Sequence, residues 1–448
     1  MRRKLKYAAA AAAGVLLLLW LFCLPRDLFE GTTYSTVVTD RNGALLGARV
    51  ADDGQWRFPP RDTLPEKFVK ALVEFEDRTF FDHCGVSPRA LVRAAIQNIR
   101  NGRIVSGGST LTMQVIRLSR QKPRTLWQKL VETCMATRLE LRCSKEEILR
   151  LYAAHAPFGG NVVGIDAAMW RYLGSDRTEL SWAEAATLAV LQNAPSSIHL
   201  ARNRDQLLAK RNRLLARLHA KGEIDEEDYA LALEEPLIGE PYPMPQYAPH
   251  LVEWYDRKAH GQRTVTHIDR DLQHRMEEVL VRWNRELRQK GIRDLAAIIV
   301  EVESGEPAAY CGNSDLSFDR DGKWVDIARS PRSSGSILKP LLYAAALEQG
   351  TILPNSLLPD VPMDFGGFAP KNFDGSYAGA IEADQALALS LNIPNVYLLK
   401  EYGILRFVET LRQAGLKTLS RPADEYGLSL ILGGAEVTFC LLYTSDAA

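Results

Sequence analysis

The stretches Glu76–Gly85, EDRTFFDHCG, and Gly107–Gln114, GGSTLTMQ, decide how this chain is interpreted. The first places an acid pair, an arginine, two phenylalanines and a histidine within ten residues. The second combines glycine with hydroxyl side chains, and the backbone N–H groups of such a loop can line a polyanion site. A carboxylate close to a phosphate-bearing leaving group indicates glycosyl transfer from a diphosphate donor, and it fits simple hydrolysis less well.

Around these stretches, the chain from about Leu64 to Glu234 has the apolar periodicity of helices. Three helix starts carry N-cap or capping-box signals: Ser87-Pro88, Ser144 with Glu147, and Ser181 with Glu184. The sequence therefore predicts one mostly α domain of roughly 170 residues.

The flanking segments have different patterns. Ser35–Val50 resembles a hairpin around Asn42-Gly43, a dipeptide that tight turns favour. The proline-rich stretch Glu234–His250 resembles a linker. Beyond it, we expect strands at Ala296–Val302 and Pro307–Cys311 and a helix at Ser336–Gln349 that ends at Gly350. Strands beside helices predict a second domain of the α/β or α+β class.

The N-terminus resembles a membrane anchor. Four basic residues within positions 2–6 precede an uncharged run from Tyr7 to Leu24, which at about 1.5 Å per residue just spans a bilayer core. The basic flank is expected to stay in the cytoplasm. A cleaved signal peptide is the alternative, but no small-x-small cleavage site follows. The chain has 448 residues with 55 basic and 55 acidic side chains, and this balance gives no argument for nucleic-acid binding.

Glu76 is the first catalytic candidate, since a glutamate beside Phe80 and Phe81 suits proton abstraction. The alternative is a solvated carboxylate paired with Arg78. Further motifs follow in order, and they favour the catalytic interpretation. Within RTLWQKLVETCMATRLE, Lys129 and Glu132 are three residues apart and share one helix face.

This order of motifs resembles the peptidoglycan glycosyltransferase domain of class A penicillin-binding proteins, over about Leu64 to Leu218. The resemblance implies a lysozyme-like helical fold that polymerises lipid II into β-1,4 glycan strands and releases undecaprenyl diphosphate. Glu76 matches the family's general base, and Glu132 matches its second glutamate, at the diphosphate or its metal. The stretch HAPFGGNVVGIDAA resembles the 1C branch.

The resemblance also implies a donor site. A divalent cation, Mg or Mn, is an open expectation at the diphosphate, and no other cofactor is expected. Three motif positions depart from the family, namely Gln128 for arginine, Ala153 for leucine and Ala154 for asparagine, which puts the rate and the diphosphate contacts in doubt. The expected substrate-binding residues are Asp77, Arg78, His83, Gly107, Gly108, Ser109, Thr110, Thr112, Gln114, Arg117, Arg124 and Lys129.

A second constellation begins at Ser336-Ile337-Leu338-Lys339. On a helix the hydroxyl and the amine would share one face, where an unprotonated lysine can activate the serine. Such a four-residue pattern is common and by itself usually structural. However, Ser390-Leu391-Asn392 follows, and both patterns belong to the known motif set of penicillin-binding proteins.

From about Thr264 to Val437 the chain resembles the family's transpeptidase domain. The resemblance implies that Ser336 attacks stem peptides and β-lactams, that Lys339 and Ser390 move protons, and that Asn392 positions the substrate. The third family element, K-T-G, does not occur after Asn392, and FCLLYTSDAA resembles a foreign tail. We therefore expect a truncated domain that cross-links poorly.

The predicted organisation is a multidomain chain with a single transmembrane helix. It comprises a cytoplasmic tail and anchor at 1–25, a β-containing connector at 26–63, the glycosyltransferase domain at 64–235, a linker or pedestal at 236–290, an incomplete transpeptidase domain at 291–438 and the foreign tail at 439–448. Expected partners are lipid II, the growing glycan strand, stem peptides, β-lactams and the membrane. The expected location is the inner membrane, with periplasmic catalytic domains. A glycan-cleaving hydrolase and a non-catalytic scaffold or β-lactam sensor remain as alternatives.

Overall fold

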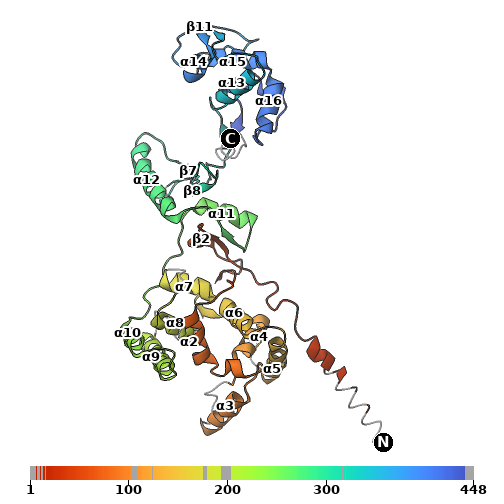
Figure 1. The fold of residues 1–448 in the computed structure, drawn as a ribbon, viewed down its shortest axis with the longest axis vertical. Coiled ribbons are helices and arrows are strands. Elements are labelled where there is room, and N and C mark those ends of the chain that lie inside the picture. Colours follow the sequence, from red (N-terminus) through yellow and green to blue (C-terminus); the bar gives the residue numbers. More distant parts are fainter. Residues whose placement is uncertain are drawn as a thin grey trace. The chain divides into compact units, whose positions relative to one another are not determined.

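The structure is a computed structural model that describes residues 7, 11, 14–15, 17–101, 108–123, 125–174, 179–192, 203–314, 316–317 and 319–438. The chain divides into two units, Met1–Thr266 and His267–Ala448, each considered by itself (Figure 1). Gly107, Arg124, the tail 439–448 and most of residues 1–16 lie outside the described residues. Within the described part of the chain, no helix has both the length and the apolar character needed to cross a membrane.

Unit 1 is mostly helical, as its apolar periodicity predicts. Both capping boxes are confirmed. At each site the serine hydroxyl accepts from the backbone N–H of the glutamate, and the glutamate carboxylate accepts from the backbone N–H of the serine. Its helices are α2 (Glu66–Glu76), η1 (Phe80–Asp82), α3 (Pro88–Asn101), α4 (Leu111–Arg120), α5 (Leu126–Glu140), α6 (Lys145–His155), α7 (Ile165–Leu173), α8 (Trp182–Leu191), α9 (Arg204–Ala220), α10 (Glu226–Glu234) and α11 (Pro249–Lys258).

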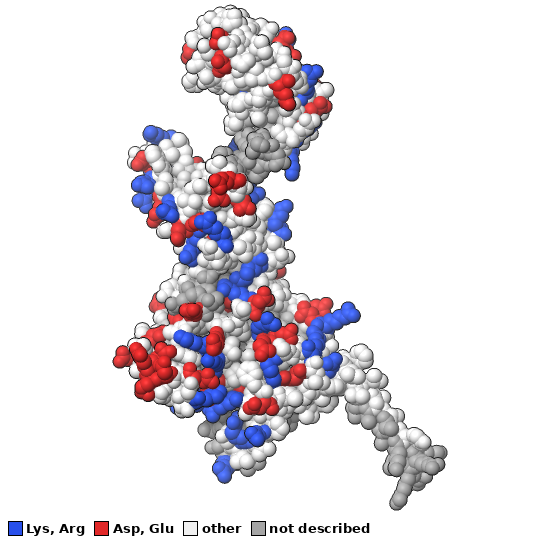
Figure 2. Space-filling view, in the orientation of Figure 1, with Lys and Arg blue, Asp and Glu red and all other residues white. Residues whose placement is uncertain are grey.

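Two small sheets flank these helices. The predicted hairpin is confirmed as β1 (Thr36–Thr39) antiparallel to β2 (Leu45–Arg49), with β6 (Arg263–Val265) parallel to β1. The second sheet has the order β3-β5-β4 and consists of β3 (Trp56–Arg57), β5 (Val162–Val163) and β4 (Pro157–Gly159). On the face drawn in Figure 2, lysine and arginine are interspersed with aspartate and glutamate over this unit, so neither sign dominates there.

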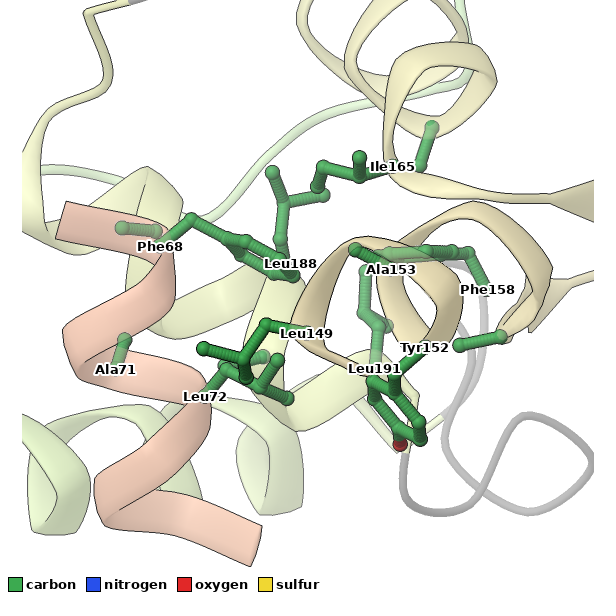
Figure 3. Close-up of a cluster of buried hydrophobic side chains, with 14 of the residues drawn as sticks. Phe68, Ala71, Leu72, Leu149, Tyr152, Ala153, Phe158, Ile165, Leu188 and Leu191 are labelled. Atoms are coloured by element: carbon green, nitrogen blue, oxygen red, sulfur yellow. The ribbon is translucent and has the colours of Figure 1, made fainter. Parts of the chain in front are cut away.

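The core of unit 1 lies between α2, α6 and α8. On α2 the buried positions Phe68, Ala71 and Leu72 follow helical spacing, whereas α8 is buried nearly all round. Figure 3 shows these three side chains beside Leu149, Tyr152 and Ala153 of α6 and beside Leu188 and Leu191 of α8. This packing holds α2, which ends at Glu76, against α6 and α8.

Unit 2 combines helices with short two-stranded pairings. The two predicted strands are confirmed as β7 (Ala297–Val300) and β8 (Pro307–Cys311), which pair antiparallel, with α12 (Arg270–Arg288) alongside. The remaining elements are β9 (Arg332–Ser333), α13 (Lys339–Glu348), β10 (Leu357–Asp360), β11 (Gly379–Glu382), α14 (Ala383–Ala388), α15 (Asn392–Tyr402), α16 (Ile404–Gln413), α17 (Ala423–Tyr426), η2 (Leu428–Leu432) and β12 (Glu436–Val437). A separate apolar core joins α13, α15 and α16.

The predicted helix at Ser336–Gln349 is wrong at its start. Helix α13 begins at Lys339, and Ser336 lies in the preceding turn, where its carbonyl accepts from the Lys339 N–H at 3.1 Å. The reason is Pro340, because a proline ring clashes with the carbonyl four residues earlier in a continuous α-helix. That carbonyl belongs to Ser336, so the helix can include Pro340 only in its first turn.

Candidate functional site

Helix α4 is the scaffold of the first site. It starts at Thr110, whose hydroxyl accepts from the Met113 N–H at 3.2 Å as an N-cap. Gln114 and Arg117 lie three residues apart on this helix and therefore on one face. Each binds one of the two candidate glutamates.

Glu76 is held by an amide. The Gln114 Nε2 donates to Glu76 Oε2 at 2.8 Å, and the Tyr152 hydroxyl lies 3.4 Å from Gln114 Oε1. Burial first, and the negative charge of Glu76 second, raise the pKa of Tyr152 well above its usual range. Tyr152 therefore stays a proton donor, and its donation to the amide oxygen turns the amide nitrogen toward Glu76.

Glu132 is held by a guanidinium. Glu132 is buried on α5, with Arg117 Nη2 at 2.9 Å from Oε2 and Nε at 3.3 Å from both carboxylate oxygens. The same Nη2 also donates to the Ser109 hydroxyl at 3.1 Å. Both glutamates thus meet one face of α4, and Arg117 joins Glu132 to the glycine-hydroxyl loop.

Asp77 and His83 lie inside the unit and contact each other. His83 Nδ1 accepts from the Gly85 N–H at 3.1 Å, so Nε2 carries the proton and donates to Asp77 Oδ2 at 3.0 Å. Asp77 Oδ2 also accepts from the Leu111 N–H at 3.1 Å, at the start of α4. Their contacts hold the first motif against α4.

The hydroxyl and glycine candidates form a similar internal frame. Thr110 donates to the Gly85 carbonyl at 2.6 Å, and Thr112 donates to Glu140 Oε1 at 2.5 Å. Gly85 has a φ of +86° and lies so close to α5 that an added Cβ would be 2.6 Å from the Ala136 carbonyl. A Cβ at Gly108 would be 3.0 Å from Leu91. Gly85 therefore allows only glycine, and Gly108 has no room for a side chain unless Leu91 shifts.

Two basic candidates differ in their surroundings. Arg78 is half-exposed, and its Nε lies 2.9 Å from the carboxylate of Glu74, one turn earlier. Arg78 thus pairs with Glu74, whereas the alternative interpretation of the sequence paired it with Glu76. Lys129 lies half-buried on α5, three residues before Glu132. The structure brings together Glu76, Ser109, Gln114, Arg117 and Glu132.

A second site lies in unit 2, around the amine of Lys339. The amine is buried and donates to the Ser390 carbonyl at 2.7 Å, the Ser390 hydroxyl at 3.2 Å and Asn392 Oδ1 at 2.9 Å. Burial lowers the pKa of Lys339 to about 8. Ser336 is exposed in the turn just before α13. Lys339, Ser390 and Asn392 thus come from two distant parts of the sequence and contact one another, and Ser336 precedes Lys339 by one turn.

Comparison with known proteins assigns both units. Residues 43–219 match the family described as "Transglycosylase", and residues 295–429 match "Penicillin binding protein transpeptidase domain". The chain belongs to the class A penicillin-binding proteins.

Two curated relatives of this class A penicillin-binding protein agree with that assignment. Penicillin-binding protein 1C of Escherichia coli is 41% identical over 89% of this chain and 52% of its own length, which supports the 1C resemblance. Penicillin-binding protein 1B of Vibrio cholerae is 31% identical over 88% of this chain and 53% of its own length. A crystal structure of penicillin-binding protein 1A from Haemophilus influenzae covers 91% of this chain and 66% of that chain, at 19% identity and a TM-score of 0.41. The chain spans about half the length of the curated relatives it matches.

Three contributors to this penicillin-binding protein's first site were missed by sequence reasoning. Tyr152 orients Gln114, and Lys145 Nζ binds both Glu140 at 2.8 Å and the His83 carbonyl at 2.7 Å. Tyr152 and Lys145 belong to the motif SKEEILRLY, so their place in it was the available signal. Glu140 ends the motif RTLWQKLVETCMATRLE, but its partners Thr112 and Lys145 come from other helices, so the motif did not indicate its contacts.

A metal site was an open expectation. Among the described residues, no group of three or more His, Cys, Asp or Glu side chains could hold a metal ion. Glu132, the candidate nearest to such a role, already forms an ion pair with Arg117.

Proposed function

We propose that this chain is a peptidoglycan glycosyltransferase that polymerises lipid II and releases undecaprenyl diphosphate. One observation carries the proposal: Gln114 and Arg117, one turn apart on α4, hold Glu76 and Glu132 on the same helix face. A carboxylate for proton transfer and a basic group for the leaving group are the two parts that the reaction needs.

In the proposed reaction, Glu76 is the general base. It takes the proton from the 4-hydroxyl of the acceptor sugar as that oxygen attacks the anomeric carbon of the donor. The donor's bond to diphosphate breaks, and configuration inverts from α to β. Gln114 fixes the Glu76 carboxylate through Oε2. A general base needs such a fixed position, because proton transfer requires hydrogen-bond contact with the reacting hydroxyl.

Negative charge develops on the departing diphosphate, and basic side chains offset it. Arg117 lies between Glu132 and Ser109, next to the glycine-hydroxyl loop, which supports a role there. Glu132 acts by orienting the Arg117 guanidinium. Lys129, on the same helix as Glu132, supplies a second cation. Asp77, His83, Thr110 and Thr112 position the loop instead of contacting substrate.

Unit 2 is proposed to act as a serine transpeptidase on stem peptides and to react with β-lactams. The Ser336 hydroxyl attacks the penultimate D-alanine carbonyl, Lys339 accepts its proton, and the terminal D-alanine leaves. The lowered pKa of Lys339, about 8, supports this role because it raises the unprotonated fraction at neutral pH. Ser390 and Asn392 hold the amine in place.

The uncharged run at residues 7–24 is proposed as a single transmembrane anchor in the inner membrane. The basic residues before it support a cytoplasmic N-terminus. Both catalytic units would then be periplasmic, where lipid II headgroups and stem peptides are accessible. The finer division into segments at 26–63, 64–235, 236–290 and 291–438 belongs to the same proposal.

Polymerisation of purified lipid II tests the first activity. Glu76→Gln keeps the size of the side chain but removes the base, so glycan strands should disappear from gels. Glu66→Gln is the matched control, because Glu66 lies on the same helix, is exposed and pairs with Lys70. Strands of normal length from Glu76→Gln would contradict the assignment. Shortening of added strands by the unaltered protein would indicate a hydrolase.

A further inference from the structure

Two buried polar side chains lie next to the Lys339 site and have no role in the proposed chemistry. Asp360 ends β10 and is 1% exposed, and Asn372 is 4% exposed. Buried polar groups are costly unless every hydrogen bond is made, so such a pair requires an explanation.

Asn372 uses both ends of its amide. Its Nδ2 donates to Asp360 Oδ1 at 2.7 Å and to the Ser376 carbonyl at 2.9 Å. Its Oδ1 accepts from the backbone N–H groups of Asn392 at 3.0 Å and Ile393 at 3.4 Å. These two N–H groups open α15 and have no helical carbonyl to bind. Asn372 is thus a cap supplied from another part of the sequence.

Asp360 holds Asn372 in that orientation. Asp360 Oδ1 accepts from the amide nitrogen, and Oδ2 accepts from the Ala378 N–H at 2.8 Å. With the nitrogen fixed on a carboxylate, the oxygen of Asn372 can only point toward α15. Aspartate or leucine at position 372 could not donate to Asp360 and accept from α15 together.

The capped segment contains a strained residue. Ser390 has a φ of +51°, in the left-handed region that non-glycine residues rarely adopt. Such a conformation persists only when its surroundings impose it. On one side Lys339 binds the Ser390 carbonyl and hydroxyl, and on the other Asn372 fixes the backbone two residues later. The Asn392 side chain is fixed as well, through the Lys371 carbonyl at 2.8 Å.

We propose that Asp360 and Asn372 are positioning residues that hold the Ser390–Asn392 turn against Lys339. The inference deepens the proposed transpeptidase function and rests on it. Without the pair, the turn is expected to relax from its left-handed conformation. The Ser390 and Asn392 oxygens would then move away from the amine that activates Ser336.

Two measurements on the full chain test whether Asp360 and Asn372 hold the Ser390–Asn392 turn. Hydrogen exchange followed by mass spectrometry reports on peptides that contain Asn392 and Ile393, whether or not the protein is active. For Asn372→Leu we expect exchange at these amides to be faster by about tenfold or more, since their acceptor is lost. The rate of Ser336 labelling by a fluorescent penicillin should fall, and its dependence on pH should shift, which a general loss of stability would not produce.

Variants around the pair sharpen the test. Asp360→Asn retains an oxygen that can accept from Asn372, so it should show a smaller change than Asp360→Ala. Asp364→Asn is the control, because Asp364 accepts from the Gly367 N–H in a local turn, and neither measurement should change.

Unchanged exchange in Asn372→Leu would overturn the proposal that Asn372 holds the Ser390–Asn392 turn. Faster exchange with an unchanged labelling rate and pH profile would overturn its positioning role. If the unaltered protein is not labelled at all, the proposed acylation fails. The exchange measurement would then still decide whether Asn372 holds the turn.

Discussion

At the scale of single residues, the orientation of Glu76 depends on an amide that is itself oriented by a buried phenol. Tyr152→Phe removes only the hydroxyl, so Gln114 loses the contact to Oε1 and can rotate away from Glu76. One neutral hydrogen bond contributes about 0.5–1.5 kcal/mol, which corresponds to a loss of about 2- to 10-fold in the polymerisation rate. Steady-state kinetics with lipid II measure this, and kcat should fall more than KM rises.

Tyr172→Phe is the control for that experiment. Tyr172 is also buried in unit 1, and its hydroxyl donates to the Phe158 carbonyl at 3.1 Å. This contact lies away from Glu76, so the variant should lose stability but keep its kcat. Equal losses of kcat in both variants would mean that the Tyr152 effect is a general loss of stability.

Lys339 leads to a prediction about pH. Its pKa of about 8 means that the unprotonated amine is a minor species at pH 6 and the major one above pH 8. Labelling of Ser336 by a β-lactam should therefore rise about tenfold per pH unit below pH 7.5 and level off above about 8.5. Lys339→Arg stays charged and should abolish the rise. A profile that is flat from pH 6 to 9 in the unaltered chain would refute the role of Lys339 as base.

Single residues also show what local sequence can predict. Glu76, Gln114 and Glu132 stand in short motifs. In the structure, Glu76 and Glu132 both contact side chains of α4, the helix that carries Gln114. Motif membership did not separate Asp77 and His83, which contact each other, from residues that face a substrate. That distinction depends on burial and on partners from other helices, and spacing along the chain carries neither.

At the scale of elements, α6 ends at His155, which is buried as a neutral ring. Its Nδ1 donates to the Leu151 carbonyl at 2.8 Å, so Nε2 accepts from the Tyr34 hydroxyl at 2.9 Å, and the ring stacks on Phe29 at 3.4 Å between centroids. Burial lowers the pKa of His155 from 6.5 to about 4. The unfolded chain therefore binds a proton between pH 6.5 and 4 that the folded chain excludes.

This difference predicts acid sensitivity of unit 1. The free energy of unfolding should fall as pH drops from about 6.5 to 4, by at most about 3 kcal/mol from this group. His155→Gln should be less stable at pH 7.5 but lose less on acidification, as thermal unfolding at several pH values would show. An unchanged slope in His155→Gln would rule out His155 as the source.

Elements also differ in how well the sequence predicts them. The starts of α6 and α8 depend on contacts within four residues, so their capping boxes could be predicted. The start of α13 depends on a local rule that the helical pattern hides, namely the clash of Pro340 with the Ser336 carbonyl. The cap of α15 comes from Asn372, twenty residues earlier, and no local pattern predicts it.

At the scale of the whole molecule, each unit has its own apolar core. The core of unit 1 gathers α2, α4, α6 and α8, and that of unit 2 gathers α13, α15 and α16, with no residue in common. A domain with its own core can unfold as a cooperative unit. The two proposed activities are then expected to be lost separately.

Core truncations test this separation. Leu72→Ala, at a fully buried position of α2, should destabilise unit 1 by about 2–5 kcal/mol. Calorimetry should show one unfolding transition at a lower temperature and a second that is unchanged, with polymerisation lost at the lower temperature while penicillin labelling persists. Leu398→Ala, buried in the core of unit 2, should give the reverse pattern. A single transition that both substitutions shift equally would mean that the two units unfold together, because a shared cooperative unit cannot lose one core and keep the other.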